Sequence, residues 1–212
     1  MDKIDLILVC PDGALCLAWE KRFKELPDVT IVHGKFEDVP EYDCMVSAAN
    51  SFGLMDSGVD AAITGYFGEQ LMYRVQARIL AEFLGEQPVG TCMIVETMHP
   101  KHPYLAHAPT MRSPMAIRHT DNAYLAMWAL LLALYRHNAV NHDIKTVLCP
   151  GLGTGTGQVP PMEAARQMAL AYKHYLNPPA TIDWDLAGDR QRAIKYGGDF
   201  GCQIPEDMIL DP

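Results

Sequence analysis

The chain has 212 residues, of which 49% are hydrophobic and 20% charged, as in one soluble globular domain of ordinary size. Its formal net charge of -9 argues against nucleic acid as the main partner, because phosphate contacts need clustered Lys and Arg side chains. An anionic small ligand stays compatible with this charge, because backbone amides can hold an anion without cationic side chains.

The first half of the chain alternates apolar runs with helical patterns. Short apolar runs bounded by turn residues predict strands at 4–10, 29–32 and 44–48. Apolar residues at helical spacing predict helices at 14–26, from Gly58 onward, and at 69–83.

The second half continues the alternation after one hairpin. Residues 91–97 and 104–109 read as two strands across a short connection, which favours an antiparallel pair. A helix capped by Thr120, a strand at 145–149 and a helix at 162–175 follow. The whole pattern predicts an α/β layered sheet with helices on both faces.

The composition changes after Asn177, where Gly, Asp and Pro become frequent and periodicity weakens. We therefore expect a core domain over 1–176 and an irregular C-terminal extension over 177–212, packed on or beside it. Trp184, Tyr196 and Phe200 are the side chains that could anchor the extension.

Six scattered cysteines form no Cys-x-x-Cys pair, and four of them lie in or beside apolar runs. With no signal-peptide pattern at the N-terminus, this usage indicates a reducing, cytoplasmic location. The longest uncharged run, 122–135, is too short to span a bilayer, so no membrane partner is expected.

The central motif is Pro-Gly-Leu-Gly-Thr-Gly-Thr-Gly-Gln-Val-Pro-Pro at 150–161, between a predicted strand and a predicted helix. Glycines allow successive amides to turn toward one point, and a helix start adds partial positive charge, so the loop suits a phosphate or diphosphate. It is not a Walker motif, and Gln158 breaks the dinucleotide spacing. A plain connector remains the alternative.

A second loop, 46–60, also leads from a strand end through glycine to a helix start. Because ligands of open α/β sheets collect at the carboxyl ends of strands, the two loops could clamp a diphosphate together. Asn50 offers a donor pair and an acceptor suited to ribose hydroxyls, although it could instead shape its own turn. Asp60 lies in the first helical turn, where it could simply be a favourable charge.

These two loops, with Ala-His-Ala-Pro-Thr-Met-Arg at 106–112 and Asn-Ala-Tyr-Leu-Ala at 122–126, resemble a bacterial and phage branch of the macrodomain (Appr-1-p processing) family. The resemblance covers about 28–175. It implies a three-layer α/β/α fold with a mixed, mostly parallel central sheet. It also implies binding of ADP-ribose or of ADP-ribosylated substrates, without a cofactor.

The resemblance also assigns site residues. Asn50 would contact the distal ribose, and Asp60 would orient water near its anomeric carbon in hydrolytic members. Gly58 and Val59 would lend amides to the first phosphate. The implied ligand-binding set comprises Ser47, Ala49, Gly58, Val59, Gly151, Gly153, Thr154, Gly155, Thr156 and Gly157.

Three departures from the family pattern keep other functions open. Ser47 replaces the first Asn of the usual Asn-Ala-Ala-Asn, and Asp56-Ser57 replaces glycines, which favours a non-catalytic ADP-ribose reader or scavenger. Lys35 stands where an Asp usually holds adenine, which keeps open an enzyme acting on another nucleotide or sugar phosphate. His99, His102 and His107 do not fall on one face of the predicted hairpin, so no metal site is expected.

Overall fold

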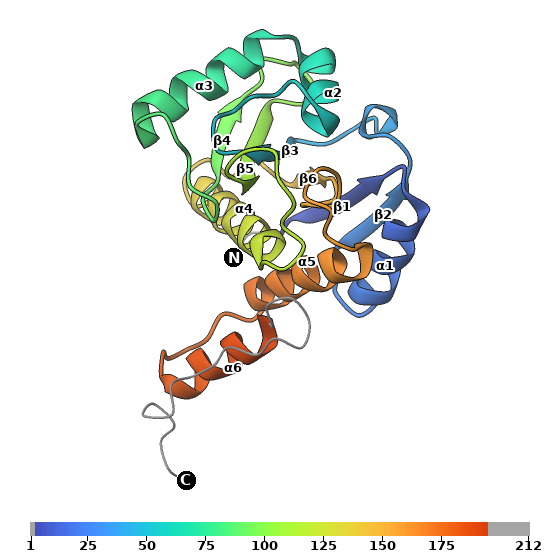
Figure 1. The fold of residues 1–212 in the computed structure, drawn as a ribbon, viewed down its shortest axis with the longest axis vertical. Helices are drawn as coiled ribbons and strands as arrows, with labels where there is room; N and C mark the ends of the chain where they lie inside the picture. Colours follow the sequence, from blue (N-terminus) through green and yellow to red (C-terminus); the bar gives the residue numbers. More distant parts are fainter. Residues whose placement is uncertain (1–2, 195–212) are drawn as a thin grey trace.

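The computed structural model describes residues 3–194, which form a three-layer α/β/α domain with one further helix (Figure 1). Its strands are β1 (Asp5–Cys10), β2 (Val29–His33), β3 (Cys44–Asn50), β4 (Met93–Glu96), β5 (Tyr104–Met111) and β6 (Thr146–Cys149). Its helices are α1 (Gly13–Phe23), α2 (Gly58–Phe67), α3 (Gln70–Phe83), α4 (Asn122–Asn138), α5 (Pro161–Leu176) and α6 (Trp184–Ile194), with a 3-10 turn, η1, at Phe36–Asp38. No helix among these residues is long and apolar enough to cross a membrane.

The strands form one mixed sheet in the order β2-β1-β6-β3-β5-β4. All neighbours are parallel except β4 and β5, which pair antiparallel as the hairpin prediction required. The predicted α/β/α architecture with a mixed, mostly parallel sheet is therefore confirmed.

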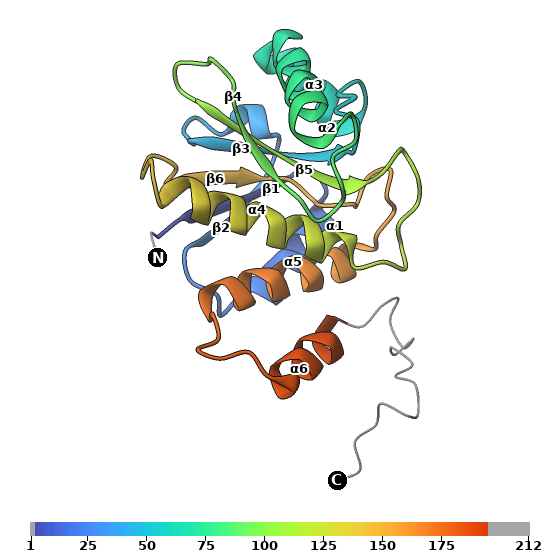
Figure 2. The ribbon, with the colours of Figure 1, turned by 90° about the vertical axis from the view of Figure 1, so that its left-hand side faces the viewer.

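Helices cover both faces of the sheet (Figure 2). One face packs on α1, α4 and α5 through a large apolar cluster that includes Cys44, Val46 and Ala106. The other packs on α2 and α3 through a cluster that includes Met45 and Leu105. Alternate residues of one strand reach opposite faces, so a doubly covered strand reads as a continuous apolar run.

The topology also decides where a ligand can bind. β3 lies between β6 and β5 and runs parallel to both, so the three carboxyl ends meet at one edge of the sheet. The loops that leave these ends, β3 to α2 and β6 to α5, are the two loops that the sequence predicted to act together.

The extension differs from its prediction over Trp184–Ile194, which forms the regular helix α6. The helix lies against the outer side of α5 (Figure 2). Trp184, one of the side chains that could anchor the extension, is 85% exposed. Tyr196 and Phe200 lie outside the described residues.

Candidate functional site

A cleft opens at the carboxyl ends of β3, β5 and β6, between the two predicted loops. Its walls come from three segments: the end of β3 with the start of α2, the end of β5, and the glycine loop after β6. The lining residues are Ala48, Ala49, Asn50, Leu54, Ser57, Gly58, Val59, Asp60, Thr110, Met111, Pro114, Gly151, Gly153, Gly155, Thr156 and Gly157.

Most of the predicted site residues therefore meet at one place. Two of them do not line the cleft: Ser47, which is fully buried, and Thr154, which is half-buried in the glycine loop. The Thr154 hydroxyl oxygen lies 2.5 Å from the position that a Cβ on Gly151 would take. The predicted set lacked six lining residues, all but the last of which lie in the quoted segments 46–60 and 106–112: Ala48, Leu54, Ser57, Thr110, Met111 and Pro114.

Asn50 stands at the end of β3, where the pairing with β5 shifts register after Ala49. Its side chain is engaged with its own loop: Oδ1 accepts from the amides of Phe52 (3.1 Å) and Leu54 (3.3 Å), and Nδ2 donates to the Leu54 carbonyl (2.8 Å). Asn50 thus shapes the turn while lining the cleft. Because Nδ2 carries two N–H groups, it can donate to a ribose hydroxyl while it keeps the bond to the Leu54 carbonyl.

Asp60 lies in the first turn of α2 and is only 5% exposed. Ser47 donates its hydroxyl to Asp60 Oδ1 at 2.7 Å. Burial raises the pKa of Asp60 to about 6, with the charge of Asp56 adding to the effect and the hydrogen bond from Ser47 opposing it. A carboxyl with this pKa can both accept and return a proton near neutral pH.

The glycine loop is shaped by close contacts as well as by backbone angles. Gly153 has φ of +72°, which favours glycine. A Cβ on Gly157 would lie 2.5 Å from the Gly153 carbonyl oxygen and 2.8 Å from the Ile117 side chain, so this position has no room for a side chain. Around Gly155, in contrast, no atom of residues 3–194 beyond its chain neighbours lies within 4 Å of an added Cβ.

The cleft offers backbone donors without cations. Within residues 3–194, the amides of Thr154, Gly155, Thr156 and Gly157 donate no hydrogen bond to the protein. The start of α2 adds uncapped amides, because Ser57 makes no side-chain cap. The sequence also predicted partial positive charge from the start of α5, but no α5 residue is among those that line the cleft.

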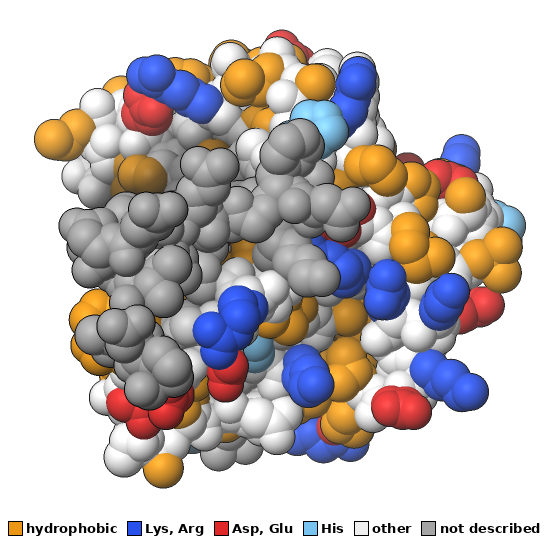
Figure 3. Space-filling model, turned by 60° about the horizontal axis from the view of Figure 1, so that its bottom comes forward, with side chains coloured by type: hydrophobic (Ala, Val, Ile, Leu, Met, Phe, Trp, Pro, Cys, Tyr) orange, Lys and Arg blue, Asp and Glu red, His pale blue; other side chains and the backbone are white. Residues whose placement is uncertain are grey.

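No Lys, Arg or His is among the lining residues, and Asp60 is their one ionisable member. Lys and Arg side chains gather instead on the lower side of the molecule (Figure 3). Arg22, Arg166 and Lys173 line a separate groove between α1 and α5. An anion in the cleft would therefore be held by N–H groups and the dipole of α2.

Lys35 and the three histidines that bear on a changed ligand or a metal lie apart from the cleft. Lys35 is exposed and precedes η1, and none of residues 34–38 lines the cleft. His99 and His102 stack with ring centroids 4.9 Å apart, whereas His107 is buried and its Nδ1 lies 2.7 Å from Gln87 Oε1. Among the described residues, no three His, Cys, Asp or Glu side chains are grouped so as to hold a metal.

The chain matches one protein family in sequence and resembles its solved structures. The Macro domain family model matches residues 46–168. An uncharacterized protein of Aquifex aeolicus is 32% identical over 141 residues, which are 66% of this chain and 78% of that protein. A macro domain-containing protein of Cupriavidus necator is 30% identical over 144 residues, 66% of this chain and 77% of that protein. A mutant of the Oceanobacillus iheyensis macrodomain, solved with ADPR, has a TM-score of 0.56 and 19% identity, covering 84% of this chain and 82% of that one.

Proposed function

The chain belongs to the macro domain family, and on that premise we propose that its cleft binds ADP-ribose or a close derivative and hydrolyses the bond at the distal ribose. The observation that carries the proposal is the set of amides at 155–157, which belong to lining residues and donate no hydrogen bond among residues 3–194, together with the uncapped start of α2 in the same cleft. The Oceanobacillus macrodomain solved with ADPR supports the choice of ligand.

The diphosphate would lie between the glycine loop and the first turn of α2. Amides from Gly58 and Val59 would meet one phosphate, and those of Gly155 and Thr156 the other. Such an arrangement needs no cationic side chain, because convergent N–H groups and a helix start already favour negative charge. It also leaves the distal ribose at the end of β3, beside Asn50 and Asp60.

Hydrolysis would then follow from Asp60. Its carboxylate would take a proton from a water molecule while the water oxygen forms a bond to the ribose anomeric carbon. The bond from that carbon to the leaving group breaks, and the leaving group takes the electron pair and the proton that Asp60 then releases. Positioning of the sugar by the diphosphate and by Asn50 supplies much of the rate without a strong nucleophile.

A reader or scavenger function is the second candidate, and one contact favours it. The bond from Ser47 already occupies one oxygen of Asp60, whose side chain is almost fully buried. This candidate predicts tight binding of ADP-ribose with no release of product. The remaining candidate, an enzyme for another nucleotide or sugar phosphate, rests on the sequence departure at Lys35, which does not line the cleft. It would show a thermal shift with that metabolite but not with ADP-ribose.

The experiment that separates the candidates compares two neighbouring acids on one ADP-ribosylated substrate. Asp60→Asn keeps the acceptor for Ser47 but removes the base, so we expect turnover to be abolished while ADP-ribose binding is largely spared. Asp56→Asn is the matched control on the same loop, where the acid is exposed; it should retain turnover. A hydrolysis rate of Asp60→Asn equal to that of the parent would refute the assigned chemistry, and no turnover by the parent would favour the reader.

A further inference from the structure

The carboxyl end of α6 is held by one side chain of the neighbouring helix. Arg166 of α5 donates from Nη1 to the Ala193 carbonyl (2.9 Å) and from Nη2 to the Ile194 carbonyl (2.5 Å). Carbonyls at a helix end lack partners in their own helix and carry partial negative charge, so a guanidinium is favourable there. No residue of α6 is buried, so these bonds, the stacking of Arg190 over Trp128 at 5.2 Å and the packing of Ile194 hold the helix in place.

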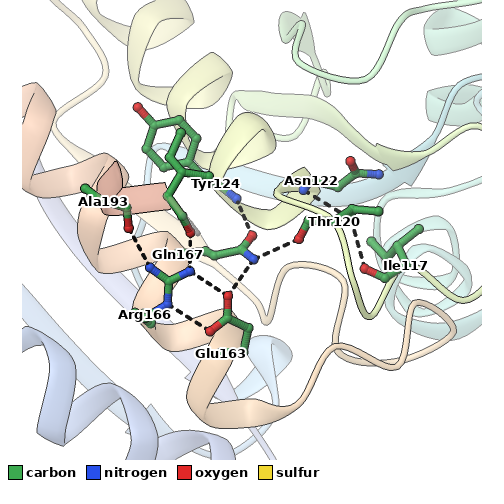
Figure 4. A network of polar contacts seen from close by, with 9 residues as sticks. Ile117, Thr120, Asn122, Tyr124, Glu163, Arg166, Gln167 and Ala193 are labelled. Atoms are coloured by element: carbon green, nitrogen blue, oxygen red, sulfur yellow. Dashed lines mark hydrogen bonds and ion pairs between the residues drawn. The ribbon is translucent and has the colours of Figure 1, made fainter. Parts of the chain in front are cut away.

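The same guanidinium also binds an acid in the first turn of α5. Arg166 Nε donates to Glu163 Oε2 (2.8 Å) and Nη2 to Oε1 (2.7 Å), a bidentate pair (Figure 4). Burial raises the pKa of Glu163, but the hydrogen bonds from Arg166 and Gln167 outweigh it and place the pKa below its usual value. Glu163 is therefore ionised at neutral pH.

Gln167 carries the contact from Glu163 to α4. Its Nε2 donates to Glu163 Oε1 and to the Thr120 carbonyl, both at 2.9 Å, and its Oε1 accepts from the Tyr124 amide at 3.1 Å. Tyr124 is the third residue of α4, and its amide has no partner within the helix. Asp121, which precedes α4, makes no side-chain cap, so Gln167 caps this helix from α5.

From α4 the contacts reach the glycine loop. Thr120 donates its hydroxyl to the Ile117 carbonyl (2.9 Å), and the Ile117 amide donates to the Gly157 carbonyl (2.8 Å). The Ile117 side chain fills the space against Gly153 and Gly157, where added Cβ atoms would lie 3.0 and 2.8 Å from it. The position of Ile117 thus determines the shape of the loop.

We propose that α6 and Arg166, acting through Glu163 and Gln167, hold the glycine loop in the conformation that binds the diphosphate, so that the docked C-terminal helix raises affinity for ADP-ribose. The ligand in this inference rests on the proposed function. Arg166, Glu163 and Gln167 do not line the cleft and are positioning residues. α6 and the end of α5 lie outside residues 46–168, the segment that the Macro domain family model matches.

The first test uses full-length variants and calorimetric titration with ADP-ribose, at a temperature where each variant is fully folded. Arg166→Ala should weaken binding by roughly three- to tenfold, within the range of couplings carried by residues that touch no ligand. Arg78→Ala is the matched control: Arg78 also pairs with a glutamate on its own helix, Glu82, and donates to a main-chain carbonyl, that of Ile94, but it lies on α3. The Arg78→Ala variant should bind ADP-ribose with the same affinity as the parent.

A second pair assigns the effect to α6. Asp189 is exposed and pairs only with Arg192, at 2.6 Å, among the contacts of residues 3–194. Asp189→Pro interrupts α6 in its interior, whereas Asp189→Ala removes the same ion pair and keeps the helix. We expect the proline variant to weaken ADP-ribose binding as Arg166→Ala does, and the alanine variant to leave it unchanged. The double variant with Arg166→Ala and Asp189→Pro should bind ADP-ribose only slightly more weakly than either single variant, because both substitutions interrupt the same contact between α6 and α5.

Hydrogen exchange of the unliganded protein separates this inference from the proposed function. The amides of Ile117, Gln158 and Val159 are bonded to carbonyls of the glycine loop and report its closure. They should exchange faster in Arg166→Ala and Asp189→Pro than in the parent and both controls, even if the parent proves not to bind ADP-ribose. Equal exchange in all five proteins, or equal ADP-ribose affinity in all five, would overturn the inference.

Discussion

Two glycines of one loop differ in the space around them, and this difference gives a sharp prediction. At Gly157 a methyl group would lie 2.5 Å from the Gly153 carbonyl oxygen and 2.8 Å from Ile117, so loop backbone and Ile117 must shift. Overpacking of this kind typically costs about 1–3 kcal/mol. At roughly 2–4 °C per kcal/mol for a domain of this size, Gly157→Ala should lower Tm by about 2–12 °C.

Gly155→Ala is the matched control, because among the described residues only its chain neighbours lie within 4 Å of the added Cβ and its φ is not in the left-handed region. We expect a change within about 0.5 kcal/mol, or a small gain from a stiffer unfolded chain. Urea unfolding of both variants measures the free energies directly. Equal free energies of unfolding for the two variants would refute the close packing of Gly157 against the Gly153 carbonyl. Gly157→Ala should also weaken ADP-ribose binding, since the strain lies in the loop that would hold the diphosphate.

Other predictions concern the charges of the cleft. Burial raises the pKa of Asp60 to about 6, so its stabilising contribution is complete below the unfolded value near 4 and is lost as pH rises through 6. Asp60→Asn should therefore match the parent near pH 4 and exceed its free energy of unfolding above pH 7, by at most roughly 3 kcal/mol in urea titrations; a difference that does not vary with pH would contradict this. Ser47→Ala removes the bond that opposes the shift, so the acid limb of the hydrolysis pH profile should move to higher pH, and a move to lower pH would count against the Ser47 contact. Because no cation lines the cleft, raising salt from about 50 to about 500 mM should change the ADP-ribose Kd less than about twofold, and a tenfold weakening would point to cationic contacts.

The layered fold could be predicted from sequence because its signals are local. The strand run ending at Cys10 is apolar on both faces, as a strand covered on both sides must be. The two strands of the β4–β5 hairpin were separable by their short connection. The meeting of the two loops followed from topology alone, since parallel neighbours bring their carboxyl ends to one edge.

The details of the site depend on contacts that local patterns do not contain. Asn50 could be placed at a strand end, but whether its amide faces a ligand or its own loop depends on the path of residues 52–54. Thr154 belongs to the glycine motif, yet it is not among the residues that line the cleft. Gln167 caps a helix 43 residues away, a partnership that no spacing rule predicts.

Helix α6 was missed for a different reason. A helix is recognised in sequence by the apolar stripe that it buries, and α6 has no buried residue. Its attachment uses main-chain carbonyls of Ala193 and Ile194, which every residue carries and which leave no sequence signal. The guanidinium of Arg166 in turn looks like an ordinary surface charge until its partners are known.

The central claim is that the cleft holds a diphosphate and a distal ribose through backbone amides, and calorimetric titration of the full chain with ADP-ribose tests it most directly. ADP, AMP and ribose 5-phosphate serve as controls for each part of the ligand. The account predicts micromolar or tighter binding of ADP-ribose, weaker binding of ADP, and little binding of AMP or ribose 5-phosphate. No heat with ADP-ribose, or equal affinity for ADP-ribose and AMP, would contradict it.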